Sequence, residues 1–401
     1  MTETKDLVGV NLAADITALH SYAESSRQIA GALLASKIPF VINDFPTIPH
    51  PSLREIMYRT VFRSRKDMSL NRFVSENNPH PINLIRLPPD TSQRLYLTHQ
   101  EYFRMRKNVA IWAWNFPKFP PEWALWFRPY REIWAVSNFT REALSKCSPV
   151  PVRTMTNPLA IDRSSLNTLY ARRRLGLDEK SCVFLFACMF HFDGGFQRKN
   201  PLAVLEAFGR AFSKADDAVL VVKTTPTSPL SVARNLKTYV IAYRELMKLA
   251  KAKSRRMIMI EEQLSRTSFL SLVSSCDSFV SLHRAEGFGQ ILAEAMYLGK
   301  PVIATAYSGN LDFMNDGNSL LVKRNLVPMA RNFETFGPRS ETYTWAEPDV
   351  DHAAELMRWV YDNREEARHM GKKASEEVAR LMNPNRVGKE IREKCENIMH
   401  N

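Results

Sequence analysis

The feature that most constrains this chain is an alternation of short apolar runs with amphipathic stretches, which continues nearly from one end to the other. A short apolar run bounded by turn residues predicts a buried strand, and an amphipathic stretch predicts a helix that covers it. Strands that alternate with helices in this way form parallel sheets with helices on both faces. The pattern therefore predicts an α/β fold of the doubly wound, Rossmann-like class.

The alternation divides into two series. The first predicts strands at residues 6–12, 39–44, 82–87, 108–114, 132–136 and 150–155, and helices at 22–37 and 140–147. The second predicts strands at 182–190, 218–223, 257–261, 278–282 and 301–305, and helices at 201–213, 231–252, 267–275, 289–298, 353–382 and 386–399. A chain of 401 residues suits two domains. We therefore predict a first domain at 1–158, a second at 159–382 and a terminal helix at 383–401.

Cysteine usage and the N-terminus indicate a compartment. The five cysteines are scattered, odd in number and form no C-x-x-C pair, which argues against a disulfide framework or a zinc site and fits a reducing compartment. The first residues show neither a basic region nor a long apolar region of a signal peptide. The longest apolar stretch, at 182–190, is far shorter than the roughly 20 residues that span a bilayer. We expect a cytoplasmic protein.

The net charge of +13 indicates an acidic partner. Nucleic acid, an anionic membrane surface and phosphorylated substrates all qualify, and the charge alone does not choose among them. Residues 54–66 interleave basic, aromatic and aliphatic side chains. Two interpretations stay open. The stretch is a helix that rests on the anionic inner face of a membrane, or it is a helix with its apolar face in the core and its basic face in solvent.

The most informative segment is 283–296, which follows a predicted strand and opens a helix. Gly287 and Gly289 let backbone N–H groups approach a ligand, and the helix N-terminus favours an anion such as a diphosphate. Glu286 and Glu294 are eight residues apart, or about 12 Å if the spacing is helical. Their carboxylates suit sugar hydroxyls, with a hexose at one end and a ribose at the other. A lone Gly-x-Gly turn is weak evidence, but the combination is much more specific.

A second basic motif accompanies this segment. Arg198 and Lys199 stand just before a helix whose first turn carries Pro201. Two cations there, added to a helix dipole, neutralise a leaving diphosphate as a glycosidic bond breaks. A solvated basic turn is the commoner explanation for such a pair alone, and the companion segment reverses that preference. Lys223, at the end of a predicted strand in the same sheet, is a third candidate cation.

Together these motifs resemble glycosyltransferase family 4, the retaining enzymes with two facing Rossmann-like domains, or GT-B architecture. Glu286 and Glu294 match the family's E-x7-E motif, with Phe288 between the two glycines. Residues 197–202 resemble its basic donor-phosphate motif. Residues 299–305 and 308–314, which include Asn310, resemble the strand and loop after the E-x7-E helix; residues 111–117 and 132–137 resemble the first domain of members that build polysaccharides. The similarity covers most of the chain and is strongest at 182–322.

The resemblance implies a retaining hexosyltransferase that acts in exopolysaccharide, lipopolysaccharide or other surface polysaccharide assembly. The donor is a nucleoside diphosphate sugar, with UDP-glucose as the first choice, and the acceptor is a glycan or a lipid-linked oligosaccharide. The donor is expected on the second domain, with Glu286, Arg198 and Lys199 catalytic and Gly287, Phe288, Gly289, Glu294, Lys223 and Asn310 donor-binding. The acceptor is expected on the first domain, with the terminal helix crossing back to it. We predict no metal and no other cofactor.

Three stretches depart from the family or mislead. Relatives carry a glycine-rich loop after the first strand, whereas residues 17–24 contain no glycine; His20 there is a polar group at the expected cleft. Asn115 stands where a glutamate is expected, and asparagine cannot act as a general base. Residues 349–351 spell D-x-D, a metal-binding signal of another transferase architecture, but Asp351 directly precedes the predicted helix at 353–382 and is better explained as its cap.

Three alternatives stay open. The same fold could host a nucleotide-sugar epimerase or a phosphorylase, since a fold does not settle chemistry. The high positive charge also raises a nucleic-acid-binding protein, which we do not expect because the chain lacks a basic repeat and an RNA-binding aromatic motif. The glycine-free loop raises a degenerate transferase that only binds sugar nucleotides.

Overall fold

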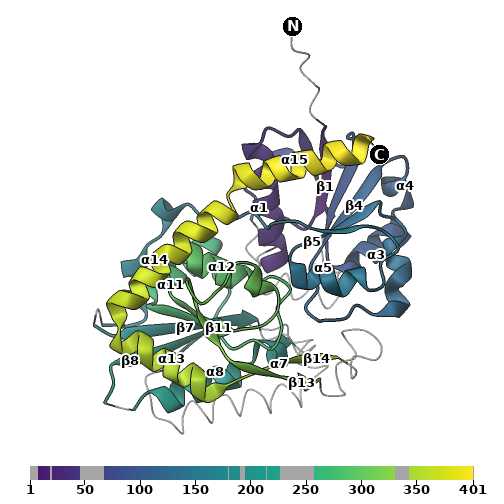
Figure 1. The fold of residues 1–401 in the computed structure, drawn as a ribbon. Helices are drawn as coiled ribbons and strands as arrows, with labels where there is room; N and C mark the ends of the chain where they lie inside the picture. Colours follow the sequence, from purple (N-terminus) through teal and green to yellow (C-terminus); the bar gives the residue numbers. More distant parts are fainter. Residues whose placement is uncertain are drawn as a thin grey trace, which may run out of the picture. The chain divides into compact units, whose positions relative to one another are not determined.

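A computed structural model of the chain describes residues 8–18, 20–45, 67–178, 180–189, 195–213, 215–225, 257–329 and 343–400 (Figure 1). These residues form two compact units. Unit 1 contains the described residues as far as Ala160 and those from Ala379 onward, and unit 2 lies within Ile161–Val378. The sequence predicts divisions after residues 158 and 382, whereas the units divide after residues 160 and 378.

Unit 1 is built on a parallel six-stranded sheet with the order β2-β1-β3-β4-β5-β6. Its strands are β1 (Val10–Ala14), β2 (Phe40–Asp44), β3 (Ile82–Arg86), β4 (Lys107–Trp112), β5 (Glu132–Ala135) and β6 (Val152–Thr154). Its helices are α1 (Ser21–Ala35), α3 (Pro89–Thr98), α4 (Gln100–Phe103), α5 (Asn138–Ser145) and α15 (Pro384–His400), with short 3-10 turns at Asn71–Phe73 and Pro121–Phe127. Helix α15 packs against α1 (Figure 1), where the Ser36 hydroxyl donates to the carbonyl oxygen of Asn385 at 3.3 Å.

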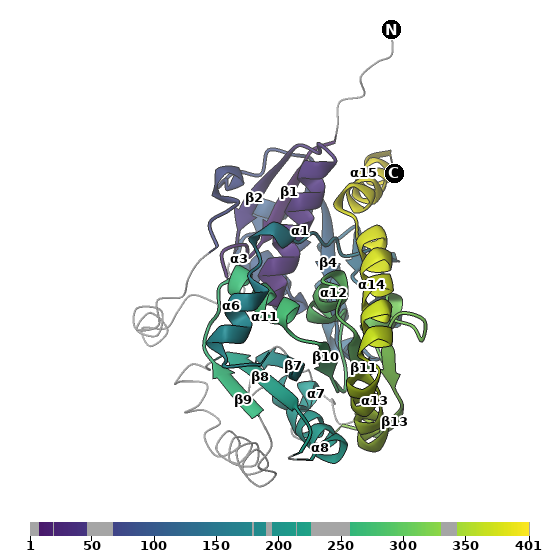
Figure 2. The ribbon, with the colours of Figure 1, turned by 90° about the vertical axis from the view of Figure 1, so that its left-hand side faces the viewer.

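Unit 2 repeats this architecture with the strand order β12-β11-β10-β7-β8-β9, again all parallel. Its strands are β7 (Cys182–Met189), β8 (Ala218–Thr225), β9 (Met257–Glu261), β10 (Ser278–Ser281), β11 (Val302–Thr305) and β12 (Leu320–Val322), and β13 (Arg324–Pro328) pairs antiparallel with β14 (Thr344–Pro348). Its helices are α6 (Thr168–Arg174), α7 (Gly195–Lys199), α8 (Pro201–Ala211), α11 (Arg266–Ser275), α12 (Gln290–Tyr297), α13 (Val350–Asp362) and α14 (Arg364–Leu381), with 3-10 turns at Arg163–Ser165 and Gly309–Asp312. Helices α8 and α13 pack side by side, as do α6 and α11 (Figure 2). The predicted fold class, α/β with two Rossmann-like sheets, is confirmed.

Burial and strand direction place the candidate site. Strand β7 lies between β10 and β8, and the residues Cys182–Cys188 are buried. A parallel strand covered on both faces reads as a continuous apolar run, which is why 182–190 is the clearest strand in the sequence. Because the strands are parallel, their carboxyl ends lie at one edge of the sheet, where ligands of such folds bind.

Several predicted elements need correction. The first strand is β1 at Val10–Ala14 rather than 6–12. The predicted helix at 353–382 is two helices, α13 and α14, which divide at Asn363. Its cap is Asp349, whose carboxylate accepts the His352 N–H at 3.0 Å, and not Asp351, which lies in the first turn and pairs with Arg210.

Helix α5 likewise begins two residues earlier than predicted, at Asn138, with Ser137 as its cap. Asn138 and Phe139 look like loop residues in the sequence, which is why the predicted helix starts too late. The predicted helix at 231–252 and the basic stretch 54–66 lie outside the described residues. None of the described helices is both long and apolar enough to cross a membrane.

Candidate functional site

Two glycines shape the turn between β10 and α12. Gly289 directly precedes α12 with φ 93° and ψ 49°, a left-handed conformation that suits glycine. Since glycine has no side chain, the first turn of α12 has no side-chain cap. Gly309 packs against the same turn, where a Cβ atom would lie 2.2 Å from the carbonyl oxygen of Gly287. The glycines therefore allow a close backbone packing that leaves a helix N-terminus without a cap, and such an end favours an anion.

The residues at the start of α12 are partly exposed to solvent. Gly287, Phe288 and Gly289 are buried, whereas Gln290 and Ile291 are half-buried. The side-chain oxygen of Gln290 is buried and accepts no hydrogen bond from the described residues. Buried acceptors without a donor are uncommon in folded proteins. The place beside Gln290 therefore suits a ligand that donates a hydrogen bond.

Glu286 and the two predicted cations form one cluster. Arg198 Nη1 lies 3.2 Å from Glu286 Oε2, and Lys199 Nζ pairs with Oε1. Arg198 also donates to the carbonyl oxygen of Ala285 at 2.7 Å. Burial raises the pKa of the Glu286 carboxyl, but the charges of Lys199 and Arg198 outweigh it and hold the pKa at about 2. The carboxylate is therefore ionised at neutral pH, and it keeps both cations at the turn.

Lys223 belongs to the same end of the sheet. It lies near the carboxyl end of β8, opposite Ala187 of β7. The buried thiol of Cys188, at the end of β7, lies within electrostatic reach of Lys199, Lys223, Arg198 and Glu286. Burial lowers the pKa of Lys223 to about 8, although the carboxylate of Glu262 acts in the opposite direction. Three cations and the carboxylates of Glu286 and Glu262 thus belong to these strand ends, an excess of positive charge that suits a polyphosphate.

Glu294 is held by a residue that sequence analysis missed. Its side chain is 1% exposed, and its two oxygens accept from Arg266 Nη1 and Nη2, each at 2.9 Å. Gln290 Nε2 also donates to Glu294 Oε1 at 2.9 Å. Arg266 is the first residue of α11, where the helix dipole disfavours a cation. A cation at that position is the signal that could have pointed to a nearby carboxylate.

Two of the predicted donor-binding residues, Asn310 and Phe288, are buried, as Glu286 and Glu294 are. Asn310 is fully buried, and its amide contacts His283 Nε2 at 3.1 Å and donates to the carbonyl oxygen of Thr305 at 3.2 Å. Burial lowers the pKa of His283, so its ring is neutral at pH 7. Phe288 is 8% exposed and packs against Phe313 at a ring distance of 5.2 Å. Both residues therefore support the turn from beneath.

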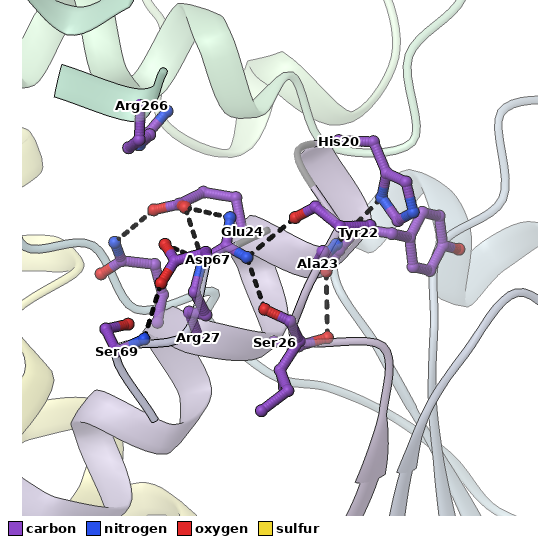
Figure 3. A network of polar contacts seen from close by, with 12 residues as sticks. His20, Tyr22, Ala23, Glu24, Ser26, Arg27, Asp67, Ser69 and Arg266 are labelled. Atoms are coloured by element: carbon purple, nitrogen blue, oxygen red, sulfur yellow. Dashed lines mark hydrogen bonds and ion pairs between the residues drawn. The ribbon is translucent and has the colours of Figure 1, made fainter. Parts of the chain in front are cut away.

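The glycine-free turn of unit 1 caps its own helix (Figure 3). His20 Nδ1 accepts the Ala23 N–H at 3.1 Å, and His20 Nε2 lies 3.3 Å from Asp15 Oδ2. Glu24, in the first turn of α1, pairs with Arg27 at 2.8 Å. Arg27 also donates to the carbonyl oxygens of residues 16 and 18, at 2.7 and 2.9 Å. Side chains of His20, Glu24 and Arg27 thus hold this turn, in which the sequence has no glycine.

The part of the chain that matches a known protein family lies within unit 2. Residues 196–377 match the family model for glycosyl transferases group 1, and this range contains every predicted site residue. No curated protein sequence matches the chain.

Among solved structures, the chain is similar to HepE from Anabaena in complex with UDP and glucose, with 12% identity, a TM-score of 0.63, and coverage of 97% of this chain and 100% of that one. It is also similar to sucrose-phosphate synthase from Thermosynechococcus elongatus, with 15% identity, a TM-score of 0.64, and coverage of 98% and 99%. A glycosyltransferase from Rickettsia africae gives 13% identity, a TM-score of 0.64, and coverage of 99% and 100%. The chain therefore has the two-domain GT-B fold, and unit 2 carries the sequence signature of glycosyl transferases group 1.

Proposed function

We propose that the chain is a retaining glycosyltransferase that transfers a hexose from a nucleoside diphosphate sugar to a glycan or lipid-linked acceptor. One observation carries this proposal: Arg198 and Lys199 pair with Glu286, which directly precedes the glycines at the uncapped N-terminus of α12. The match of this region to glycosyl transferases group 1 supports it. UDP and glucose in the complex of HepE make UDP-glucose the first donor to test.

The proposed roles follow from the contacts in the site. Arg198 and Lys199 bind the diphosphate, while the pair of Glu286 with both cations holds them in place before the donor arrives. Once a diphosphate supplies negative charge, the Glu286 carboxylate is available to accept hydrogen bonds from hexose hydroxyls. Glu294 and the side-chain oxygen of Gln290 accept from the ribose hydroxyls.

The reaction proceeds on one face of the sugar. The bond between the anomeric carbon and the diphosphate oxygen breaks as the acceptor oxygen bonds to the same carbon from the same side, through an oxocarbenium-like transition state. The acceptor proton passes to an oxygen of the leaving phosphate. Arg198 and Lys199 stabilise the charge that develops on the diphosphate, an electrostatic contribution that grows in the transition state. This scheme requires no metal.

The acceptor and the setting belong to the proposal as well. The acceptor binds to unit 1, and the product enters exopolysaccharide, lipopolysaccharide or other surface polysaccharide assembly. The protein works in the cytoplasm, with a peripheral contact to the anionic inner face of the membrane. A thermal-shift screen with nucleoside diphosphate sugars identifies the donor, because a ligand that binds only the folded state raises the melting temperature.

The variant Glu286→Gln tests the role of the central carboxylate. Removing its charge leaves Arg198 and Lys199 without their shared partner, so we expect UDP to bind at least as tightly while hexose transfer is lost. Calorimetry measures UDP binding and release of UDP measures transfer. Arg210→Ala, which removes an exposed pair elsewhere in unit 2, is the control and should change neither. Full transfer by the Glu286 variant would overturn the assignment.

Product analysis separates the competing chemistries. A retaining transferase consumes donor in the presence of a glycan acceptor and forms a new glycosidic bond with the donor's anomeric configuration, which NMR reports. An epimerase converts the donor without an acceptor, and inversion at the anomeric carbon would contradict the retaining mechanism.

A further inference from the structure

A pocket lies in unit 2 at the start of helix α8. Its volume is about 180 Å³, and its wall includes Phe196, Asn200, Leu202, Arg284 and Glu347. Arg198, Lys199 and Glu286 do not line it. The pocket is therefore separate from the diphosphate site proposed above, although it shares the loops that carry that site.

Asn200 gives this pocket an unused polar group. The residue directly precedes α8 with φ 54° and ψ 54°, and it is 4% exposed. Its side-chain Nδ2 is buried and has no hydrogen-bond partner among the described residues. A buried amide without a partner is costly. Asn200 lines the pocket, so a turn of its side chain toward a ligand there would give Nδ2 an acceptor and remove that cost.

The start of α8 supplies further donors to the same wall. The helix has no side-chain cap, and Pro201 at its first position has no N–H group. The next N–H groups belong to Leu202 and Ala203, and both residues line the pocket. Backbone N–H groups in the first turn of a helix have no intrahelical acceptor. One wall of the pocket thus offers donors from the backbone and from the Asn200 side chain.

The charges around the pocket select its ligand class. Glu206, Glu347 and Arg284 line it. Both oxygens of Glu347 accept from Arg284, at 2.6 and 2.8 Å, and Glu206 pairs with Arg210. Each charge of the wall thus already has a partner of opposite sign and does not attract a phosphate, whereas the N-terminus of a helix disfavours a cation. A neutral ligand with hydroxyl groups fits both walls, because a hydroxyl donates to a carboxylate and accepts from an amide.

The size of the pocket limits the size of its ligand. At ~30 Å³ per water molecule, the pocket volume corresponds to about six waters. This volume is below the ~300–1,000 Å³ typical of pockets for larger ligands. Apolar side chains of Phe196, Pro201 and Val350 complete the wall and suit the C–H face of a ring. We propose that this pocket binds one neutral sugar residue, either a free monosaccharide or one unit of a glycan. The proposal does not depend on the transferase activity.

Saturation-transfer NMR in the presence of saturating UDP tests this site. The probes are methyl α-D-glucopyranoside, methyl α-D-galactopyranoside, methyl α-D-mannopyranoside, maltotriose and inorganic phosphate. We expect at least one sugar to receive saturation while UDP occupies the donor site. Saturation transfer to a methyl glycoside indicates a site for a monosaccharide, whereas saturation transfer to maltotriose alone indicates a site for a glycan. No response from any sugar, or displacement of the sugar by phosphate, would overturn the proposal.

Asn200→Gly is the decisive variant, because glycine accepts the same left-handed backbone and removes only the amide. Loss of one hydrogen bond should weaken sugar binding about fivefold. Lys37→Gly, an exposed position in unit 1 with φ 55°, is the matched control and should leave sugar binding unchanged. Hydrogen exchange of the wild type gives a second measurement: the sugar should slow exchange at Leu202 and Ala203, and unchanged exchange there would overturn the site.

Discussion

Two turns of this molecule have the same place in their units but differ in how the following helix is capped. Each lies between a buried parallel strand and a helix, β10 and α12 in unit 2, β1 and α1 in unit 1. In unit 2 the residue before the helix is Gly289, and the helix has no side-chain cap. In unit 1 it is His20, whose ring caps the helix, with Glu24 in the first turn. One turn is left ready for a ligand, and the other is closed by its own side chains.

The charges strengthen this contrast. In unit 2, Arg198 and Lys199 pair with Glu286, and Lys223 lies near the carboxyl end of β8. At the turn of unit 1, Arg27 pairs with both Glu24 and Asp67, and Asp15 contacts His20. A diphosphate is attracted to the first arrangement and repelled by carboxylates in the second. The two units, which share one architecture, thus differ in the residue that precedes the helix and in the charges around the turn.

The double variant Arg198→Ala/Lys199→Ala should give the largest effect. Each side chain offers charge-assisted hydrogen bonds worth ~1.5–3 kcal/mol, so the Kd for UDP should rise at least about 100-fold. Isothermal calorimetry at fixed ionic strength measures it, with Arg210→Ala as the control cation in the same unit. An unchanged affinity would mean that the unit 2 turn is not the anion site, and the comparison would fail.

Gly289→Ala should have the next largest effect. A side chain in the left-handed conformation costs about 1–2 kcal/mol, and the new Cβ would lie 3.0 Å from Leu292 Cδ1. We expect that loss in the free energy of unfolding, together with about tenfold weaker UDP binding, or ~1.4 kcal/mol, as the turn shifts. Gly299→Ala is a matched control with φ 75° and no neighbour within 4 Å. It should lose stability but keep UDP affinity, and equal losses of affinity in both variants would remove the role of the turn.

The fold could be predicted well where burial is continuous. Strand β7 is buried over Cys182–Cys188 and β10 over its whole length, and each differs from its prediction by one residue at its end. Strand β1 was placed too early, at 6–12 instead of Val10–Ala14, although both ranges contain the polar Asn11. Asn11 is nonetheless buried, since its Nδ2 donates to Asn83 Oδ1 on the neighbouring strand at 2.8 Å. Pairing between strands distant in sequence decides such cases, and a local pattern does not contain it.

The candidate site, like the fold, could be predicted from the sequence only in part. Glu286, Arg198 and Lys199 could be chosen from local motifs, but their ion pairs join segments 87 residues apart in the chain. The pairing of Arg266 with Glu294 was missed for that reason. The buried position of Asn310 was also missed, because an asparagine in a loop resembles a ligand-binding residue until its neighbours are known. Local chemistry identifies candidate residues, whereas tertiary contacts decide which of them support the others.

The pH dependence of UDP binding sharpens the contrast in charge. Burial lowers the pKa of Lys223 to about 8, so the lysine loses its positive charge as the pH rises through that value. UDP should therefore bind about fivefold more weakly at pH 9 than at pH 7, which corresponds to ~1 kcal/mol. Lys223→Met should bind UDP as the wild type does at high pH and should lack this dependence. Calorimetry of both proteins across this range measures the difference, and identical pH profiles would exclude Lys223 from the cluster.

His20→Ala should give the smallest effect on UDP and addresses the closed turn. Loss of the cap should cost ~0.5–2 kcal/mol of local stability, visible as faster hydrogen exchange at the Ala23 amide, whose partner is His20 Nδ1. The Kd for UDP should not change, because unit 2 supplies the proposed anion site. His20→Asn should restore the protection, since asparagine caps helices well. If His20→Ala weakened UDP binding as strongly as loss of Arg198 and Lys199 does, the turn of unit 1 would contribute to the phosphate site despite its carboxylates, and the contrast between the two turns would be wrong.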